Sequence, residues 1–295
     1  MKILVTGATG QLGGKIVEHL AKKKEATNII AGTTNTESEK AQALAEKGFE
    51  VRKTDFEDQA SLVEAFKGVD KVYIVSTLPD VELAVRQQTN IVEAAKQTGV
   101  QHIVYSSAPK ADISAFVLAA PHRERENILK QSGIAYTIVR NNWYVENELA
   151  SIQQSLNGAP WLTSAGEGKV GWALRDELAE ATANVLANEG HENKVYELGG
   201  VLLTQTEFVA TVNEITGKDI QVMNVDSKTY GDVLKQANLP EPMIGMLTAI
   251  QEGIKTGGLD NSHTDLEMLL GRKPAPLKEA LQQVLAKIKS NIVIA

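Results

Sequence analysis

Short hydrophobic runs alternate with longer amphipathic stretches along the first half of this chain. Runs rich in Val, Ile and Tyr predict strands at residues 2–6, 28–33, 50–53, 71–76, 102–106 and 136–140. Helical periodicity fills the gaps, at residues 12–23, 37–47, 61–66, 81–98 and 122–132. Strands that are apolar on both faces are typical of parallel sheets covered by helices. The pattern therefore predicts an α/β fold with a doubly wound parallel sheet.

This rhythm breaks after residue 140. Helices are expected at residues 143–156 and 176–188, a turn at 165–169 and a further strand at 194–198. From residue 204 onward the pattern is mostly helical. We therefore predict a nucleotide-binding domain over residues 1–146 and a smaller, mostly helical lobe over residues 147–295. The chain is expected to return to the sheet near residue 195.

Composition narrows the class of protein. The 295 residues carry a net charge of −7 with scattered basic side chains, which argues against nucleic acid as a partner. No apolar run is long enough to predict a membrane span, and a strand at the N-terminus leaves no room for a signal peptide. A cytoplasmic location is the resulting expectation. The absence of cysteine and the scattered histidines predict no disulfide and no metal site.

The first predicted strand runs directly into a glycine-rich turn that opens a helix. Such a unit holds a dinucleotide pyrophosphate: one glycine turns the chain, the second admits the phosphates, and the third lets helix and strand pack closely. Free N–H groups at the helix start then face the anion. The alternative is a tight turn without a ligand. The candidate residues are Gly7, Thr9, Gly10, Gln11, Leu12 and Gly13.

The ends of the next strands offer further cofactor contacts. An acidic residue after the second strand favours NAD, and an arginine there favours NADP. This chain has neither, and the missing carboxylate favours NADP(H) over NAD(H). Turn chemistry is the alternative for the residues after the second strand, and the N-cap of the next turn is the alternative for Asp55. The candidates in strand order are Thr33, Thr34, Asn35, Asp55, Phe56, Ser76, Thr77, Leu78 and Ser106.

A catalytic acid is not obvious. Short-chain dehydrogenases pair a tyrosine with a lysine four residues later, and none of the six tyrosines here has that lysine. This leaves hydride transfer to an acceptor that needs little acid help, or binding without catalysis. His122, with Glu126 one helical turn on, is the candidate for contacting substrate or supplying a proton. A surface pair beside Arg123 and Arg125 is the alternative.

Several segments together resemble the NmrA-like atypical short-chain dehydrogenases, and within that family the bacterial quinone and triphenylmethane dye reductases. The matching residues are 6–13 (TGATGQLG), Asp55, the His122 and Glu126 pair, 140–147 (RNNWYVEN), 175–179 (RDELA) and 190–198 (GHENKVYEL). The resemblance implies a Rossmann domain, a small C-terminal lobe and NADPH in the cleft. Active members pass a hydride from the nicotinamide to a quinone or a cationic dye.

The resemblance also assigns residues after the sixth strand. Asn141 and Asn142 would flank the nicotinamide, with Asn142, Trp143 and Tyr144 on the substrate side. Packing between the lobes is the alternative for the two aromatic residues. One departure is that relatives that prefer NADPH often have Arg-Asn where this chain has Thr34-Asn35.

The expected function is that of an NAD(P)H-dependent oxidoreductase of quinones or similar electron-poor small molecules, as a monomer or homodimer. Two alternatives stay open. One is a non-catalytic NAD(P)-sensing regulator that binds a partner protein, and the other is a reductase or isomerase of another small molecule.

Overall fold

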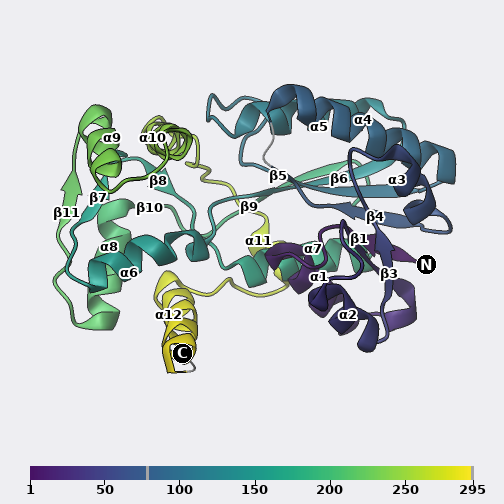
Figure 1. Ribbon diagram of the computed structural model, residues 1–295, viewed down its shortest axis with the longest axis horizontal. Coiled ribbons are helices and arrows are strands. Elements are labelled where there is room, and N and C mark those ends of the chain that lie inside the picture. The colour runs from purple at the N-terminus through teal and green to yellow at the C-terminus, as the bar shows by residue number, and fades with distance from the viewer. Residues whose placement is uncertain (78–79, 294–295) are drawn as a thin grey trace.

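A seven-stranded parallel sheet forms the centre of the molecule (Figure 1). The computed structural model describes residues 1–77 and 80–293. The strand order β3-β2-β1-β4-β5-β6 is that of a dinucleotide-binding sheet, and β9 adds a seventh strand beside β6. The predicted doubly wound α/β fold is therefore confirmed. The strands are β1 (Ile3–Val5), β2 (Ile29–Thr33), β3 (Glu50–Lys53), β4 (Lys71–Ile74), β5 (His102–Ser107), β6 (Ala135–Asn141) and β9 (Lys194–Leu198).

Helices cover both faces of this sheet. One face carries α3 (Gln59–Phe66), α4 (Val81–Thr98) and α5 (Ala119–Gln131), with α4 packed between the other two. The opposite face carries α1 (Gln11–Ala21), α2 (Glu39–Glu46), α7 (Arg175–Ala187) and the short α11 (Leu266–Leu270), and a 3₁₀ turn (Ala26–Asn28) precedes β2. Each interface holds its own hydrophobic cluster. Burial on both faces explains why the strands lack polar alternation.

A second lobe lies beyond the carboxyl ends of the central strands (Figure 1). Its core gathers large apolar side chains, including Trp161, Trp172 and Phe208. Phe116, which precedes α5, also belongs to this core, so a segment of the sheet side reaches into the lobe. The lobe contains α6 (Leu149–Leu156), α8 (Gln205–Thr216), α9 (Ser227–Gln236), α10 (Glu241–Lys255), α12 (Leu277–Val293), and the strand pairs β7 (Trp161–Thr163) with β11 (Val222–Asn224) and β8 (Lys169–Val170) with β10 (Leu203–Thr204).

The predicted helix over residues 143–156 is wrong at its start. Trp143 and Tyr144 are extended, and backbone hydrogen bonds join this segment to Ala173. A 3₁₀ turn (Val145–Glu148) follows, and only then does α6 begin. The long-range bonds to Ala173 replace the local helical ones, and sequence periodicity cannot reveal them. The short strands β7, β8, β10 and β11 were likewise not predicted.

The chain returns to the sheet after entering the lobe. Helix α7 packs on α1, β9 pairs with β6, and α11 packs on α7. The domain boundary between residues 146 and 147 stays a prediction. Residues on both sides of it contribute to the sheet and to the helices that cover it. Within the described residues, no helix is both long and apolar enough to cross a membrane.

Candidate functional site

The glycine turn has the geometry of an anion site. Gly7 has φ +63°, and a Cβ on Gly13 would lie 2.3 Å from the carbonyl oxygen of Gly7. Helix α1 can therefore pack against the turn only with glycine at residue 13. Gly10 is the N-cap, no side chain caps this helix end, and the first turn carries no acidic residue. The N–H groups of Gln11 and Leu12 thus belong to an uncapped, positive helix end that suits a pyrophosphate.

The residues after β2 divide into a buried and an exposed part. Thr33 is buried, and its hydroxyl lies 3.1 Å from that of Thr9 in the glycine turn. Thr34 and Asn35 are exposed at the rim. The side-chain oxygen of Asn35 accepts from the backbone N–H of Glu37, so turn chemistry does operate here. Thr34 has an exposed side chain at the position where the sequence predicts discrimination between NADP and NAD.

After β3, Asp55 and Phe56 are half-buried. The Asp55 carboxylate accepts from the backbone N–H of Glu57, 3.0 Å away, which makes a local turn. The N-cap of α3 is Asp58, whose side chain accepts from Ser61. Asp55 therefore caps the short turn that follows it, as the alternative interpretation predicted, and its contact with a cofactor stays a prediction.

The ends of β4 and β5 are tied to each other. The Ser106 hydroxyl accepts from the backbone N–H of Ser76 at 2.9 Å, and Ser106 is fully buried. Arg125 of α5 donates to the hydroxyl of Thr77 at 2.8 Å. Ser106 and Arg125 thus hold Ser76 and Thr77, two of the predicted cofactor contacts, in place. Leu78, another predicted contact, lies outside the described residues.

A cavity of about 390 Å³ opens where these strand ends meet the lobe. It brings together eight of the residues predicted from sequence: Gln11, Leu12, Ser76, His122, Asn141, Asn142, Trp143 and Tyr144. Its position at the carboxyl ends of parallel strands is where such sheets bind ligands. Apolar residues that the sequence did not point to complete the wall: Phe116, Leu118, Met246, Ile250 and Leu259.

The two asparagines after β6 differ in what their amides do. Asn142 donates to the backbone carbonyl of Leu259 at 3.0 Å and accepts from the N–H of Trp143 at 2.7 Å. Asn141 donates to the Tyr144 hydroxyl at 3.3 Å, but its amide oxygen is enclosed without a partner in the described part of the chain. An enclosed acceptor is costly unless a donor meets it. A carboxamide N–H, such as that of nicotinamide, fits this requirement.

The aromatic wall is held by polar contacts on its outer side. The buried carboxyl of Glu148 accepts from the indole N–H groups of Trp143 and Trp172, each at 3.0 Å. Burial raises the pKa of Glu148 despite these two donors. The Arg175 guanidinium lies 4.7 Å from the ring centre of Tyr144, in cation–π geometry. Packing between the lobes and lining of the cavity are therefore compatible roles for Trp143 and Tyr144.

His122 is buried at the cavity wall, and only 5% of it is exposed. Its Nδ1 lies 2.8 Å from the hydroxyl of Tyr105 on β5. Burial, aided by the charge of Arg125, lowers the pKa of His122 to about 4. The surface interpretation is wrong, because Arg125 and Glu126 are buried as well. Among the described residues, the imidazole has no hydrogen bond to Glu126, so the expected His–Glu pair is also wrong.

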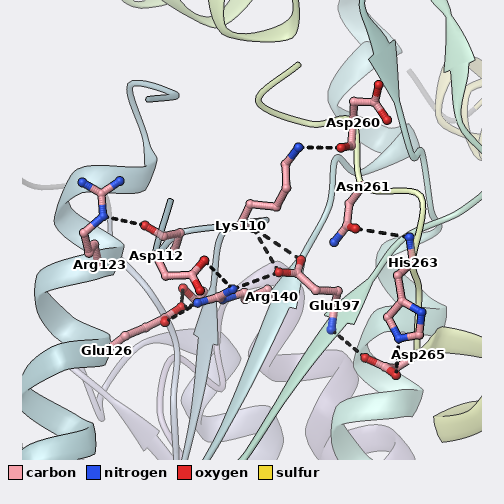
Figure 2. Close-up of polar contacts among 12 residues, drawn as sticks. Lys110, Asp112, Arg123, Glu126, Arg140, Glu197, Asp260, Asn261, His263 and Asp265 are labelled. Carbon is pink, nitrogen blue, oxygen red and sulfur yellow. Dashed lines mark hydrogen bonds and ion pairs between the residues drawn. The ribbon is translucent and has the colours of Figure 1, made fainter. Parts of the chain in front are cut away.

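Glu126 instead belongs to an ion cluster around Arg140 (Figure 2). Arg140 donates to both oxygens of Glu126 (2.9 and 2.6 Å), to Asp112 (2.9 Å) and to Glu197 (3.0 Å). Burial alone would raise the pKa of Glu126, but its bonds to Arg140 outweigh burial and lower it. Lys110 extends the cluster through its backbone N–H to Glu197. We call these five residues the Arg140 cluster.

The side chain of Lys110 connects this cluster to the cavity wall. Its ammonium donates to the backbone carbonyls of Gly257 (2.9 Å) and Asp260 (2.6 Å). These carbonyls flank Leu259, which lines the cavity and accepts from Asn142. The ion cluster thus positions a loop of the lobe over the strand ends.

Comparison with known proteins assigns the chain to a family. The model of the NmrA-like family matches residues 1–283. The chain belongs to the NmrA-like family. This confirms the resemblance to that family noted in the sequence.

Among NmrA-like proteins, quinone oxidoreductase 2 of Escherichia coli is 38% identical over 283 residues, 96% of this chain and 98% of the relative. Its crystal structure with NADPH matches with a TM-score of 0.91 and 38% identity, covering 96% of this chain and 99% of that one. Triphenylmethane reductase of Citrobacter sp. with NADP(H) matches with a TM-score of 0.91 and 36% identity, covering 96% and 100%.

The sequence did not predict those cavity residues that come from distant parts of the chain. Met246, Ile250 and Leu259 come from the lobe, and no local motif marks them. Tyr105 lies at the predicted end of the fifth strand and has no lysine four residues later. Its partner, His122, lies seventeen residues on, and this pairing was not predicted. The alternation of side-chain direction along a strand could have indicated that Tyr105 and Ser107 share one face of β5.

Proposed function

We propose that this protein transfers a hydride from NADPH to a quinone or a similar electron-poor acceptor. The observation that carries the proposal is the cavity itself: an uncapped helix end and the unpartnered amide oxygen of Asn141 lie beside an aromatic wall. The similarity to an NADPH-dependent quinone oxidoreductase along almost the whole chain supports it.

The cofactor would lie across the carboxyl ends of the strands. Gly7, Gly10 and Gly13 keep the turn open for the pyrophosphate, and the exposed Thr34 and Asn35 would face the adenosine 2′-phosphate. Asp55 and Phe56 would flank the adenine. When bound, the dihydronicotinamide supplies a hydride. The assignment of these residues, and the preference for NADP(H), belong to this proposal.

The acceptor would stack within the apolar part of the cavity. Trp143 and Tyr144 offer flat surfaces that suit a planar quinone, and their outer contacts to Glu148 and Arg175 keep them fixed. Apolar residues of the lobe close the cavity and exclude water, which favours direct hydride transfer. Holding donor and acceptor within about 3.5 Å then supplies much of the rate.

The test is the initial rate of NADPH and of NADH oxidation with a small benzoquinone, alongside cofactor binding by protein fluorescence. We expect quinone-dependent oxidation with a higher kcat/KM for NADPH. Tight NADPH binding without turnover over a panel of quinones and dyes would reject the proposal and favour a nucleotide-sensing regulator.

A further inference from the structure

The Tyr105–His122 contact determines which nitrogen of the imidazole carries the proton. Tyr105 is completely buried, and in the described part of the chain His122 Nδ1 is the hydrogen-bond partner of its hydroxyl, at 2.8 Å. The charge of Arg125 also acts on this hydroxyl, and a guanidinium only donates. The Tyr105 proton therefore has one acceptor, Nδ1 of His122.

The opposite tautomer would leave the Tyr105 hydroxyl proton buried without an acceptor. Such an unsatisfied donor costs about 1–3 kcal/mol. A hydrogen bond from Tyr105 to Nδ1 avoids this cost and leaves the ring proton on Nε2. Among the described residues Nε2 has no hydrogen-bond partner, and it is not one of the fully enclosed polar atoms. His122 lines the cavity, so this free N–H is available to an acceptor molecule.

We propose that His122 is a neutral hydrogen-bond donor to the carbonyl oxygen of the acceptor, and that Tyr105 is the positioning residue that keeps the proton on Nε2. This inference rests on the proposed function. When a quinone takes up a hydride, negative charge appears on one of its oxygens, and a fixed N–H donor stabilises that charge. His122 keeps its proton, and the proton that completes the hydroquinone comes from water.

The electrostatics of the pair support donation without proton transfer. Burial holds His122 neutral near pH 7, since its pKa is lowered to about 4. Burial also raises the pKa of Tyr105 far above its usual range, despite Arg125. Transfer of a proton from Tyr105 through His122 to the acceptor would leave a Tyr105 phenolate, and it would therefore be energetically unfavourable. The arrangement replaces the missing tyrosine–lysine pair with a donor that needs no ionisation.

Comparing a quinone with a cationic dye as acceptor distinguishes hydrogen-bond donation by His122 from a purely structural role of this residue. A quinone gains a developing oxyanion on hydride transfer, whereas a triphenylmethane dye cation takes up hydride to become neutral at carbon. His122→Leu removes the donor, and His122→Gln returns an amide N–H close to the Nε2 position. We expect H122L to lower kcat with benzoquinone by about 10²-fold. H122Q should recover most of that loss, and both variants should leave reduction of the cationic dye within a few-fold of wild type.

Tyr105→Phe tests the positioning role. We expect it to lower kcat for the quinone several-fold without affecting the dye, whereas Tyr196→Phe, which removes a tyrosine hydroxyl that contacts His191 at 2.9 Å away from the cavity, serves as the matched control. Equal losses with both acceptors in H122L would overturn the proposal, since they would indicate a role in packing or cofactor binding.

Nitrogen-15 NMR of the histidine side chains gives a readout independent of turnover. At pH 7 we expect the His122 signal, identified by its loss in H122Q, to show an unprotonated Nδ1 and a protonated Nε2. A protonated Nδ1, or an imidazolium, would reject the inference even if quinone reduction is observed. If the wild type reduces no quinone, the proposed function fails, and the NMR result still decides the tautomer.

Discussion

The ammonium group of Lys110 donates a 2.6 Å hydrogen bond to the backbone carbonyl of Asp260, 150 residues further along the chain. Lys110 itself has φ 48°, a left-handed conformation that non-glycine residues rarely adopt. Its backbone N–H is held by Glu197 and its side chain by the loop around Leu259 (Figure 2). One residue of the sheet side thus fixes a wall of the cavity that belongs to the lobe.

Lys110→Met should therefore loosen the loop around Leu259 while keeping the aliphatic part of the side chain. We expect KM for the quinone to rise about 3- to 10-fold, the size of losing roughly 1 kcal/mol of binding. The dissociation constant of NADPH should change little. Lys255→Met is the matched control, because the Lys255 side chain is exposed and its ion pair with Glu252 is long, at 4.0 Å. A K110M enzyme with an unchanged KM would show that the loop holds its place without this lysine.

Gly13→Ala should damage both stability and cofactor binding. The new Cβ would lie 2.3 Å from the carbonyl oxygen of Gly7, so α1 must move away from the turn. Overpacking of this kind costs about 1–3 kcal/mol, and NADPH affinity should fall at least tenfold. Urea denaturation and fluorescence titration measure the two effects. Gly245→Ala is the control: nothing lies near its Cβ in α10, so this change should stabilise the fold slightly. Full NADPH affinity in G13A would contradict the turn geometry.

Thr34 should govern the choice between the two cofactors. A carboxylate at this exposed position would repel the 2′-phosphate of NADPH and accept from the ribose hydroxyls of NADH. We expect Thr34→Asp to shift the ratio of kcat/KM values toward NADH by at least about tenfold. Thr34→Arg should shift it toward NADPH. An unchanged ratio in both variants would place the 2′-phosphate elsewhere.

His122 should make the stability of the cofactor-free protein depend on pH. Its pKa is lowered by burial and by Arg125, and Glu126 only partly opposes this. Between the ordinary value of 6.5 and about 4, the unfolded chain binds a proton that the folded chain does not. Stability therefore falls as pH falls through this window, by about 2 kcal/mol at pH 5. In urea denaturation at pH 7 and pH 5, His122→Gln should lose about 2 kcal/mol less than wild type. Equal losses would indicate that His122 is protonated in the fold.

Arg140→Met should destabilise the fold strongly, because it removes the buried cation shared by the carboxylates of Glu126 and Glu197 and leaves Glu126 only the ion pair with Lys130, at 3.0 Å, within the described residues. Removing one partner of a buried ion pair costs about 3–5 kcal/mol. Asp112→Asn removes an exposed partner of the same cluster and should cost at most about 1 kcal/mol. Denaturant unfolding compares the two variants. A similar, small effect for both would mean that water reaches the buried carboxylates.

The part of the fold that could be predicted from the sequence is the central sheet, because its elements follow from residue patterns that are local in the chain. Each central strand is a short run buried on both faces, so its position follows from composition alone, and the glycine turn follows from spacing. The lobe could not be predicted in this way, since β11 pairs with β7 about sixty residues earlier through three residues each. Trp143 was placed in a helix for the same reason, because its partner Ala173 is thirty residues away.

The residues of the candidate site likewise fall into those that local sequence predicts and those that depend on long-range packing. Residues at strand ends, such as Ser76 and Asn141, could be predicted because parallel strands place their carboxyl ends together. The partner of His122 could not, because it depends on how α5 packs across β5. Leu259 and Met246 could not, because they reach the cavity from the lobe.

The return of the chain to the sheet has a consequence for how the protein folds. Helix α7 covers α1, β9 closes the sheet edge beside β6, and α11 covers α7. The nucleotide-binding layers are therefore incomplete until residues near 270 have been synthesised. A fragment that ended after β6 would expose the apolar side of α1 and an unpaired strand edge, both prone to aggregation. Residues far along the chain thus complete the layers around the sheet, and residues 1–146 alone do not contain all of them.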